Sequence, residues 1–221
     1  MIVSSAQLCF IFGAGGHARV VLDAILLSGA RLDIKIVDAD QALHGQTLFD
    51  QPIVGGDEHA FQNPGALFVV AVGGTTSLHP RKTIYEKAVA SGLKPFTVIH
   101  PKAIVSPRAT ISEGVHILPG AIVNCGAVIG PNTIINSGAL IEHDCRIGAH
   151  VSIAPKAVVC GAGEIGGETF VGAGAVVKEG CSVGERSLIA AGAVVIRPVP
   201  ADSIAKGVPA AVSPRQSGSR P

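Results

Sequence analysis

The sequence has 221 residues, and its 17 Lys and Arg nearly balance its 16 Asp and Glu, so the formal net charge is +1. This balance argues against the basic surface with which proteins bind nucleic acids or anionic lipids, and no apolar run reaches the roughly 20 residues that span a bilayer. The five cysteines form no C-x-x-C pair, which favours buried thiols over a metal or disulfide site. We therefore expect a cytoplasmic, metal-free protein with neither membrane insertion nor a nucleic-acid partner.

Residues 1–95 are predicted to form a small domain of alternating strands and helices. Short apolar runs at 8–12, 34–37 and 67–72 are predicted strands, and an apolar helical pattern follows the first of them. A second helix is predicted to contain residues 81–90. This alternation is typical of a small parallel sheet of Rossmann type.

A glycine-rich turn follows the first predicted strand. Residues 13–17 read Gly-Ala-Gly-Gly-His, and Asp38 ends the next strand, as in a relaxed dinucleotide fingerprint. The glycines would let backbone N–H groups approach a pyrophosphate at the positive end of a helix, and Asp38 would accept hydrogen bonds from a ribose or base. A purely structural turn is the alternative. His44, His59 and His79 of this domain are predicted to be surface residues.

The second part of the chain repeats every six residues. Ile or Val occupies every sixth position from Ile99 to Val195, seventeen times without a break, and a small residue usually stands two positions earlier. A period of six fits neither an amphipathic helix nor the 8–12-residue spacing of a sandwich. Such a regular repeat predicts a solenoid, in which each unit packs on its neighbours.

Six residues make one short strand and one corner, so three repeats would close a triangular coil of 18 residues. The repeated Ile and Val would point into the prism and stack on their copies in adjacent coils. Val195 lies 96 positions after Ile99, which gives a little more than five coils of 18 residues. His100 and His116 fall at positions where we expect outward, solvated side chains.

One dense polar cluster stands within the repeat. Residues 141–145 read Ile-Glu-His-Asp-Cys, and a second histidine follows at His150. Both histidines lie at predicted corners and would project outward. An imidazole beside a carboxylate suits general-base chemistry near neutral pH. Two solvated corner histidines are the alternative.

The repeat ends at Pro198 and Pro200, because proline cannot donate to a strand ladder. The β-helical domain is therefore predicted to cover residues 96–211. Residues 212–221 are rich in Ser, Pro, Arg and Gly, and we expect them to form a disordered tail.

The combination of these features resembles the hexapeptide-repeat sugar acetyltransferases of bacterial surface-glycan synthesis. Relatives of this kind acetylate nucleotide-linked sugars of the bacillosamine pathway, GDP-perosamine or sialic acid. The resemblance rests on the turn at 13–17, the uninterrupted repeat with its segment 141–145, and the closing Gly-Val-Pro-Ala motif at 207–210. It implies a left-handed parallel β-helix after the α/β domain, acetyl-CoA as co-substrate, and a homotrimer with active sites between neighbouring prisms.

The resemblance also implies roles for single residues. His143 would be the general base in a direct transfer, and Asp144 would enhance its basicity, although many relatives carry Glu at that position. The residues implied as acetyl-CoA contacts are His150, Gly161, Ala173 and Ser182. The residues implied in binding the nucleotide-linked sugar are Gly15, Gly16, His17, Asp38 and Gly73, with Arg81 as a candidate for phosphate.

The leading hypothesis is N-acetylation of the 4-amino group of a nucleotide-linked 4-amino-4,6-dideoxy sugar. The same site geometry would serve an O-acetyltransferase acting on sialic acid or a related sugar. A catalytically silent β-helix used as a scaffold is a second alternative, against which the intact His143 and Asp144 pair argues. An NAD-dependent oxidoreductase is a third, but only the repeat follows the small domain. UDP, GDP and dTDP sugars all remain open.

Overall fold

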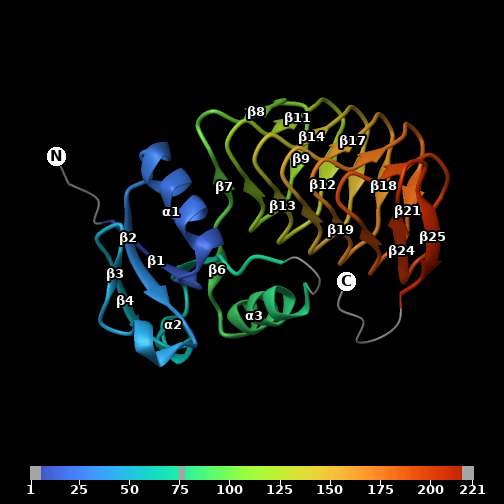
Figure 1. Cartoon of the computed structure of the whole chain (residues 1–221). Coiled ribbons are helices and arrows are strands. Elements are labelled where there is room, and N and C mark those ends of the chain that lie inside the picture. Colours follow the sequence, from blue (N-terminus) through green and yellow to red (C-terminus); the bar gives the residue numbers. More distant parts are fainter. Residues whose placement is uncertain (1–5, 75–77, 216–221) are drawn as a thin grey trace.

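The computed structural model describes residues 6–74 and 78–215, and these form two domains in close contact. Figure 1 shows the α/β domain lying against the first coils of a long β-helix. The predicted fold class is confirmed. Within the described residues, no helix has the length and apolar character required to cross a lipid bilayer.

The N-terminal domain contains a six-stranded sheet with the order β3-β4-β2-β1-β5-β6. All of its pairs are parallel except the β3–β4 hairpin. Its strands are β1 (Gln7–Phe12), β2 (Leu32–Val37), β3 (Thr47–Leu48), β4 (Gln51–Gly55), β5 (Leu67–Val70) and β6 (Lys94–Pro95), and its helices are α1 (Gly16–Ser28), η1 (Gln41–Leu43), α2 (Glu58–Phe61) and α3 (His79–Ala90).

The β-helix has three faces, and up to β23 the strands of each face pair in parallel with partners 18 positions apart, so the predicted coil length is confirmed. The first face comprises β7 (Val98–Ile99), β10 (His116–Ile117), β13 (Ile134–Ile135), β16 (Ser152–Ile153), β19 (Phe170–Val171), β22 (Leu188–Ile189), β24 (Ser203–Lys206) and β25 (Ala211–Pro214). The second face comprises β8 (Ile104–Val105), β11 (Ile122–Val123), β14 (Leu140–Ile141), β17 (Val158–Val159), β20 (Val176–Val177) and β23 (Val194–Val195). The third face comprises β9 (Thr110–Ile111), β12 (Val128–Ile129), β15 (Arg146–Ile147), β18 (Glu164–Ile165) and β21 (Ser182–Val183).

The core of the β-helix consists of the repeated Ile and Val side chains. From Ile117 to Val195 every one of them is at most 3% exposed. The first three differ, because Ile99 is 41% exposed and Val105 and Ile111 are only partly buried. The first coil has no preceding coil on which to stack, and this end effect is expected of a solenoid.

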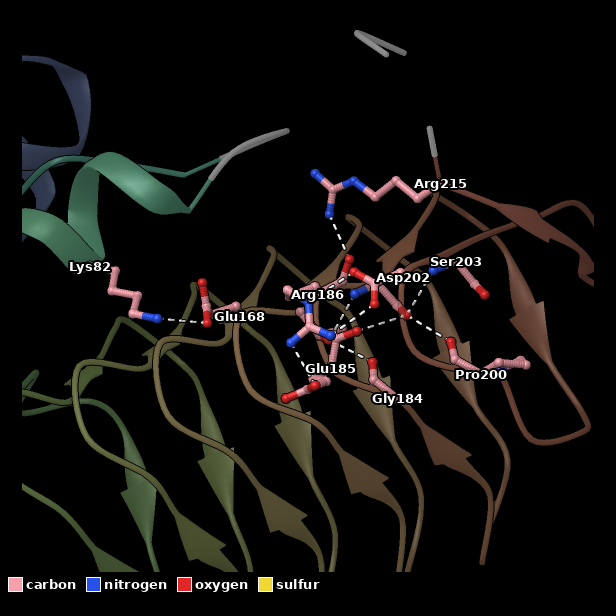
Figure 2. Close-up of polar contacts among 11 residues, drawn as sticks. Lys82, Glu168, Gly184, Glu185, Arg186, Pro200, Asp202, Ser203 and Arg215 are labelled. Atoms are coloured by element: carbon pink, nitrogen blue, oxygen red, sulfur yellow. Dashed lines mark hydrogen bonds and ion pairs between the residues drawn. The ribbon is translucent and has the colours of Figure 1, made fainter. Parts of the chain in front are cut away.

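The two domains share one apolar cluster, which fixes the N-terminal domain against the first face. In this cluster Val98, Leu118 and Ile134 of the β-helix pack with residues of β1 and α1. An ion pair joins the domains farther along, where Lys82 Nζ of α3 lies 2.9 Å from Glu168 Oε1 (Figure 2). The junction is therefore an extended contact with both apolar and charged parts.

The predicted disordered tail is partly wrong, because residues 211–214 form β25, an antiparallel partner of β24. An unpaired edge strand offers free backbone groups, and pairing with β25 satisfies them. Beyond the strand, Arg215 donates to the carbonyl of Arg186, whose guanidinium holds Asp202 through two contacts of 2.8 Å (Figure 2). The rest of the predicted tail, residues 216–221, lies outside the described residues.

Candidate active site

A cavity of about 480 Å³ lies between the N-terminal domain and the first face of the β-helix. It collects five of the six predicted nucleotide-sugar residues, namely Gly15, Gly16, His17, Asp38 and Gly73. The β-helix contributes Ile134, Asn136 and Ser152 to its wall. Sequence reasoning missed these three, because only the packing of the two domains brings them to the cavity.

The glycine turn borders open space where α1 begins. Gly15 caps the helix, and a Cβ built on Gly15 or Gly16 would meet no atom within 4 Å. The backbone N–H groups at this helix start are therefore accessible to an anion. Asp38 braces the turn, since its Oδ2 accepts from Ala14 N at 2.7 Å and its Oδ1 accepts from Asp40 N at 2.9 Å.

His17 stands in the wall of this cavity between the two domains. A Cβ on Gly73 would lie 3.3 Å from His17 Cβ, so Gly73 allows the close approach. The imidazole stacks on His116, with ring centroids 5.7 Å apart and an interplanar angle of 20°. Burial, with a smaller contribution from the charge of Arg81, lowers the pKa of His17 to about 4. The ring is therefore neutral at pH 7.

The prediction that His100 and His116 are solvated is wrong. His116 is fully buried and His100 is 5% exposed, because the N-terminal domain covers the first face around His116. Burial lowers the pKa of His116 well below its usual value. His100 instead accepts a hydrogen bond at Nδ1 from Lys102 N, 3.0 Å away.

Arg81 is not positioned to contact a phosphate in the cavity. Its side chain is 2% exposed, and its guanidinium donates to the backbone carbonyls of Val70, Val72 and Asn132. Burial lowers its pKa to about 9, which leaves it protonated at pH 7. Arg81 thus fastens the end of β5, next to Gly73, onto a corner of the β-helix.

His143 and Asp144 occupy the corner between β14 and β15, where the second and third faces meet. His143 Nδ1 lies 3.0 Å from Asp144 Oδ2, and the two side chains are 59% and 69% exposed. The carboxylate holds Nδ1–H and leaves Nε2 as the proton acceptor. The aspartate therefore reaches the imidazole in spite of being shorter than the glutamate of many relatives.

Two glycines make room for this pair on the adjacent coils. A Cβ on Gly161 would lie 2.6 Å from His143 Nε2, so the imidazole rests against the backbone of the next coil. Gly126, on the preceding coil, has a φ of +73° and lies beneath the Asp144 carboxylate. The contact of Gly126 with Asp144 was missed, because a corner glycine in such a repeat carries no distinct signal.

The predicted acetyl-CoA residues fall at different corners of the prism. Ser182 begins β21 beside the corner of His143 and Gly161, in a groove of about 450 Å³ along the third face. Ala173 follows β19 at the corner between the first and second faces. Within one chain, the structure brings Gly161 and Ser182 near His143 but not Ala173.

His150 lies at the remaining corner, between the third and first faces, and is half-buried beneath α3. Its ring packs edge-on against Tyr85 at 5.6 Å, and its Nδ1 lies 2.9 Å from Asn132 Nδ2. Burial, with a smaller contribution from the charge of Lys82, lowers its pKa. In one chain His150 is therefore separated from His143 by the width of the third face.

The corner that carries His143 is opposite the first face, against which the cavity is built. Successive strands pass from first to second to third face, so a corner between the second and third faces has the first face across from it. The prism core stands between the two. Within a single chain, the cavity and His143 therefore lie on opposite sides of the prism.

The outer surface of the second face is aliphatic on every coil. Side chains alternate along a strand, so the residue before each buried Ile or Val points outward. On this face the outward residues are Ile104, Ile122, Leu140, Val158, Val176 and Val194. Ile104 is 64% exposed. The third face instead presents polar and charged side chains such as Arg146 and Glu164.

Each of the two domains matches a known protein family. Residues 9–88 match the PglD N-terminal domain, and residues 126–161 and 163–197 match the bacterial transferase hexapeptide repeat. PerB from Caulobacter crescentus, solved with CoA and GDP-perosamine, is 34% identical, with a TM-score of 0.84 over 93% of this chain and 96% of that one. The acetyltransferase domain of PglB from Neisseria gonorrhoeae, solved with acetyl coenzyme A, is 31% identical, with a TM-score of 0.84 over 93% and 98%.

These matches extend over nearly the whole chain, at an identity above 30% and with the same two-domain order. The chain therefore belongs to the PglD-type family of hexapeptide-repeat sugar N-acetyltransferases and is an acetyltransferase.

Proposed function

We propose that this protein transfers the acetyl group of acetyl-CoA to the 4-amino group of a nucleotide-linked 4-amino-4,6-dideoxy sugar. The observation that carries the proposal is the exposed His143–Asp144 pair, with its Nδ1–Oδ2 contact of 3.0 Å, in a chain that also carries a nucleotide-sized cavity at the start of α1. The complex of PerB with CoA and GDP-perosamine supports this pairing of substrates.

In the proposed reaction the amine nitrogen attacks the thioester carbonyl carbon directly. His143 Nε2 takes the proton that the nitrogen loses, and Asp144 stabilises the imidazolium through Nδ1–H. The tetrahedral intermediate collapses as the carbon–sulfur bond breaks. The CoA thiolate then receives the proton from His143, which restores the neutral base.

The proposed assembly is a homotrimer in which the aliphatic second faces pack around a common axis. Each second face is bounded by the corner of His143 on one side and by the corner of Asn136 and Ala173 on the other. Three prisms arranged in this way bring the His143 corner of one chain against the Asn136 corner of the next. The cavity of one chain and the base of its neighbour would then open into the same groove.

This arrangement also accounts for the scattered acetyl-CoA positions. Gly161 and Ser182 would line the groove from the chain that supplies His143, and Ala173 would line it from the neighbouring chain. The pantetheine arm would lie along this groove, against the backbone of successive coils. His150 remains a proposed contact of acetyl-CoA. Its corner, between the third and first faces, lies on the outside of the proposed trimer.

The proposal is tested by following CoA release from acetyl-CoA in the presence of UDP-, GDP- and dTDP-linked 4-amino-4,6-dideoxy sugars. We expect rapid release with one of them and negligible release without an acceptor. Release with sialic acid alone would replace the proposal with O-acetylation of that sugar. No release with any acceptor, combined with saturable acetyl-CoA binding, would instead support a scaffold.

A further inference from the structure

A cluster of four polar residues, three of them buried and His17 half-buried, lies at the junction of the two domains, behind the cavity. Within residues 6–74 and 78–215, all the buried side-chain nitrogen and oxygen atoms that have no hydrogen-bond partner belong to this cluster. They are His17 Nε2, Arg81 Nη2, both ring nitrogens of His116, and Asn132 Oδ1. Buried polar atoms are nearly always paired, so such a concentration calls for an explanation.

Ring stacking, hydrogen bonds and charge connect the members of this cluster. The rings of His17 and His116 stack, and Arg81 Nε donates to the carbonyl of Asn132 at 3.3 Å. Arg81 also donates to the carbonyl of Val72, directly before the Gly73 that lies against His17. The charges that shift the pKa values of His17, Arg81 and His116 come from the cluster itself and from Tyr85. Arg81 is thus the cluster's one cation at pH 7.

The orientation of His17 leaves one of its nitrogens for the cavity. His17 lines the cavity, but its Nε2 is buried, so Nδ1 is the polar edge left to a ligand. The His116 ring stacks nearly parallel to the His17 ring. The nitrogens of His116 therefore do not lie in the plane of the His17 ring, where a hydrogen bond to His17 Nε2 would have to form. A buried cation attracts the lone pair of a neutral imidazole nitrogen and repels its N–H.

We infer that Arg81 is a positioning residue that selects the Nδ1–H tautomer of His17, so that His17 presents an N–H donor to a phosphoryl oxygen of the nucleotide. The inference rests on the proposed function, because it names what the cavity recognises. The positive charge of Arg81, which acts on the His17 ring, favours a lone pair on the buried Nε2, and the proton then resides on the nitrogen that borders the cavity. His116 fixes the plane of the ring by stacking. Arg81 thereby acts on the ligand through His17 and without touching it.

The inference is tested first by the nitrogen-15 spectrum of histidine-labelled protein without ligand, in which the two neutral tautomers have distinct patterns. The His17 signals are assigned by their absence in His17→Asn. We expect the Nδ1–H pattern at pH 7, its loss in Arg81→Met, and its retention in Arg81→Lys, which keeps the charge. His116→Phe, which keeps the stacked ring but removes its nitrogens, should retain it as well. An Nε2–H pattern in the unmodified protein would overturn the inference even if Arg81→Met failed to fold.

Binding of UDP, GDP, uridine and guanosine supplies the functional readout. Loss of one charge-assisted hydrogen bond should weaken diphosphate binding about 10–100-fold in Arg81→Met, with no change for the nucleosides. A merely structural role would weaken all four ligands together and would overturn the inference. Intact nucleotide binding with the wrong tautomer contradicts this inference alone, whereas absence of nucleotide binding and of CoA release contradicts the proposed function.

Discussion

Replacing His143 with asparagine is expected to lower kcat by about 10²–10⁴-fold, the usual contribution of a positioned general base. Asparagine keeps a polar side chain of similar size but cannot accept the proton of the attacking amine. Because the His143 side chain is 59% exposed and its ring hydrogen bond is to the exposed Asp144, the fold should not depend on it. Steady-state CoA release and the melting temperature are the two measurements.

The matched control for this variant is His59→Asn, which changes another exposed histidine that lies in α2 and does not line the cavity. The control should retain normal turnover. Near-normal turnover of His143→Asn would remove His143 from its proposed role. An equal loss of turnover in both variants would show that the effect is not specific to His143.

Replacing Ile135 with aspartate is expected to abolish the folded β-helix. Ile135 is fully buried in the central part of the prism core, and the nearest positions of its stack are Ile117 and Ile153. An unpaired carboxylate at such a position costs several kcal/mol, which rivals the total stability of most domains. Urea unfolding followed by circular dichroism measures the change.

The conservative variant Ile135→Val separates the effect of charge from that of shape. It keeps the β-branched side chain and removes one methylene, so a loss of about 1 kcal/mol is expected. Unchanged urea unfolding of Ile135→Asp would contradict the inward orientation of the repeated positions.

The β-helix could be predicted from the sequence because a short repeated segment specifies each of its strands and corners. Each corner and strand repeats the same six-residue pattern, and stacking needs only copies of that pattern. The repeated pattern does not predict that Ile99 is 41% exposed, because this exposure arises from the absence of a preceding coil. The predicted strands of the small domain were found as well, since parallel strands are continuous apolar runs.

The features that sequence reasoning missed depend on contacts between distant segments. His116 occupies an outward position, and only the docking of α1 and its glycine turn buries it. Arg81 was assigned to phosphate, yet the backbone carbonyls around it belong to β5 and to a corner of the β-helix. The β3–β4 hairpin turns at Phe49 and Asp50, both with positive φ, without the glycine that usually signals such a turn.

The central claim is that each active site combines the cavity of one chain with His143 of its neighbour, and mixing two inactive variants tests it most directly. His143→Asn removes the base, and Gly16→Phe fills the cavity, because a side chain at Gly16 would enter open space. After unfolding and joint refolding in equal amounts, random trimers should regain about a quarter of normal CoA release, since one site in four receives both intact parts. No recovery in mixtures that do form mixed trimers would contradict the shared site.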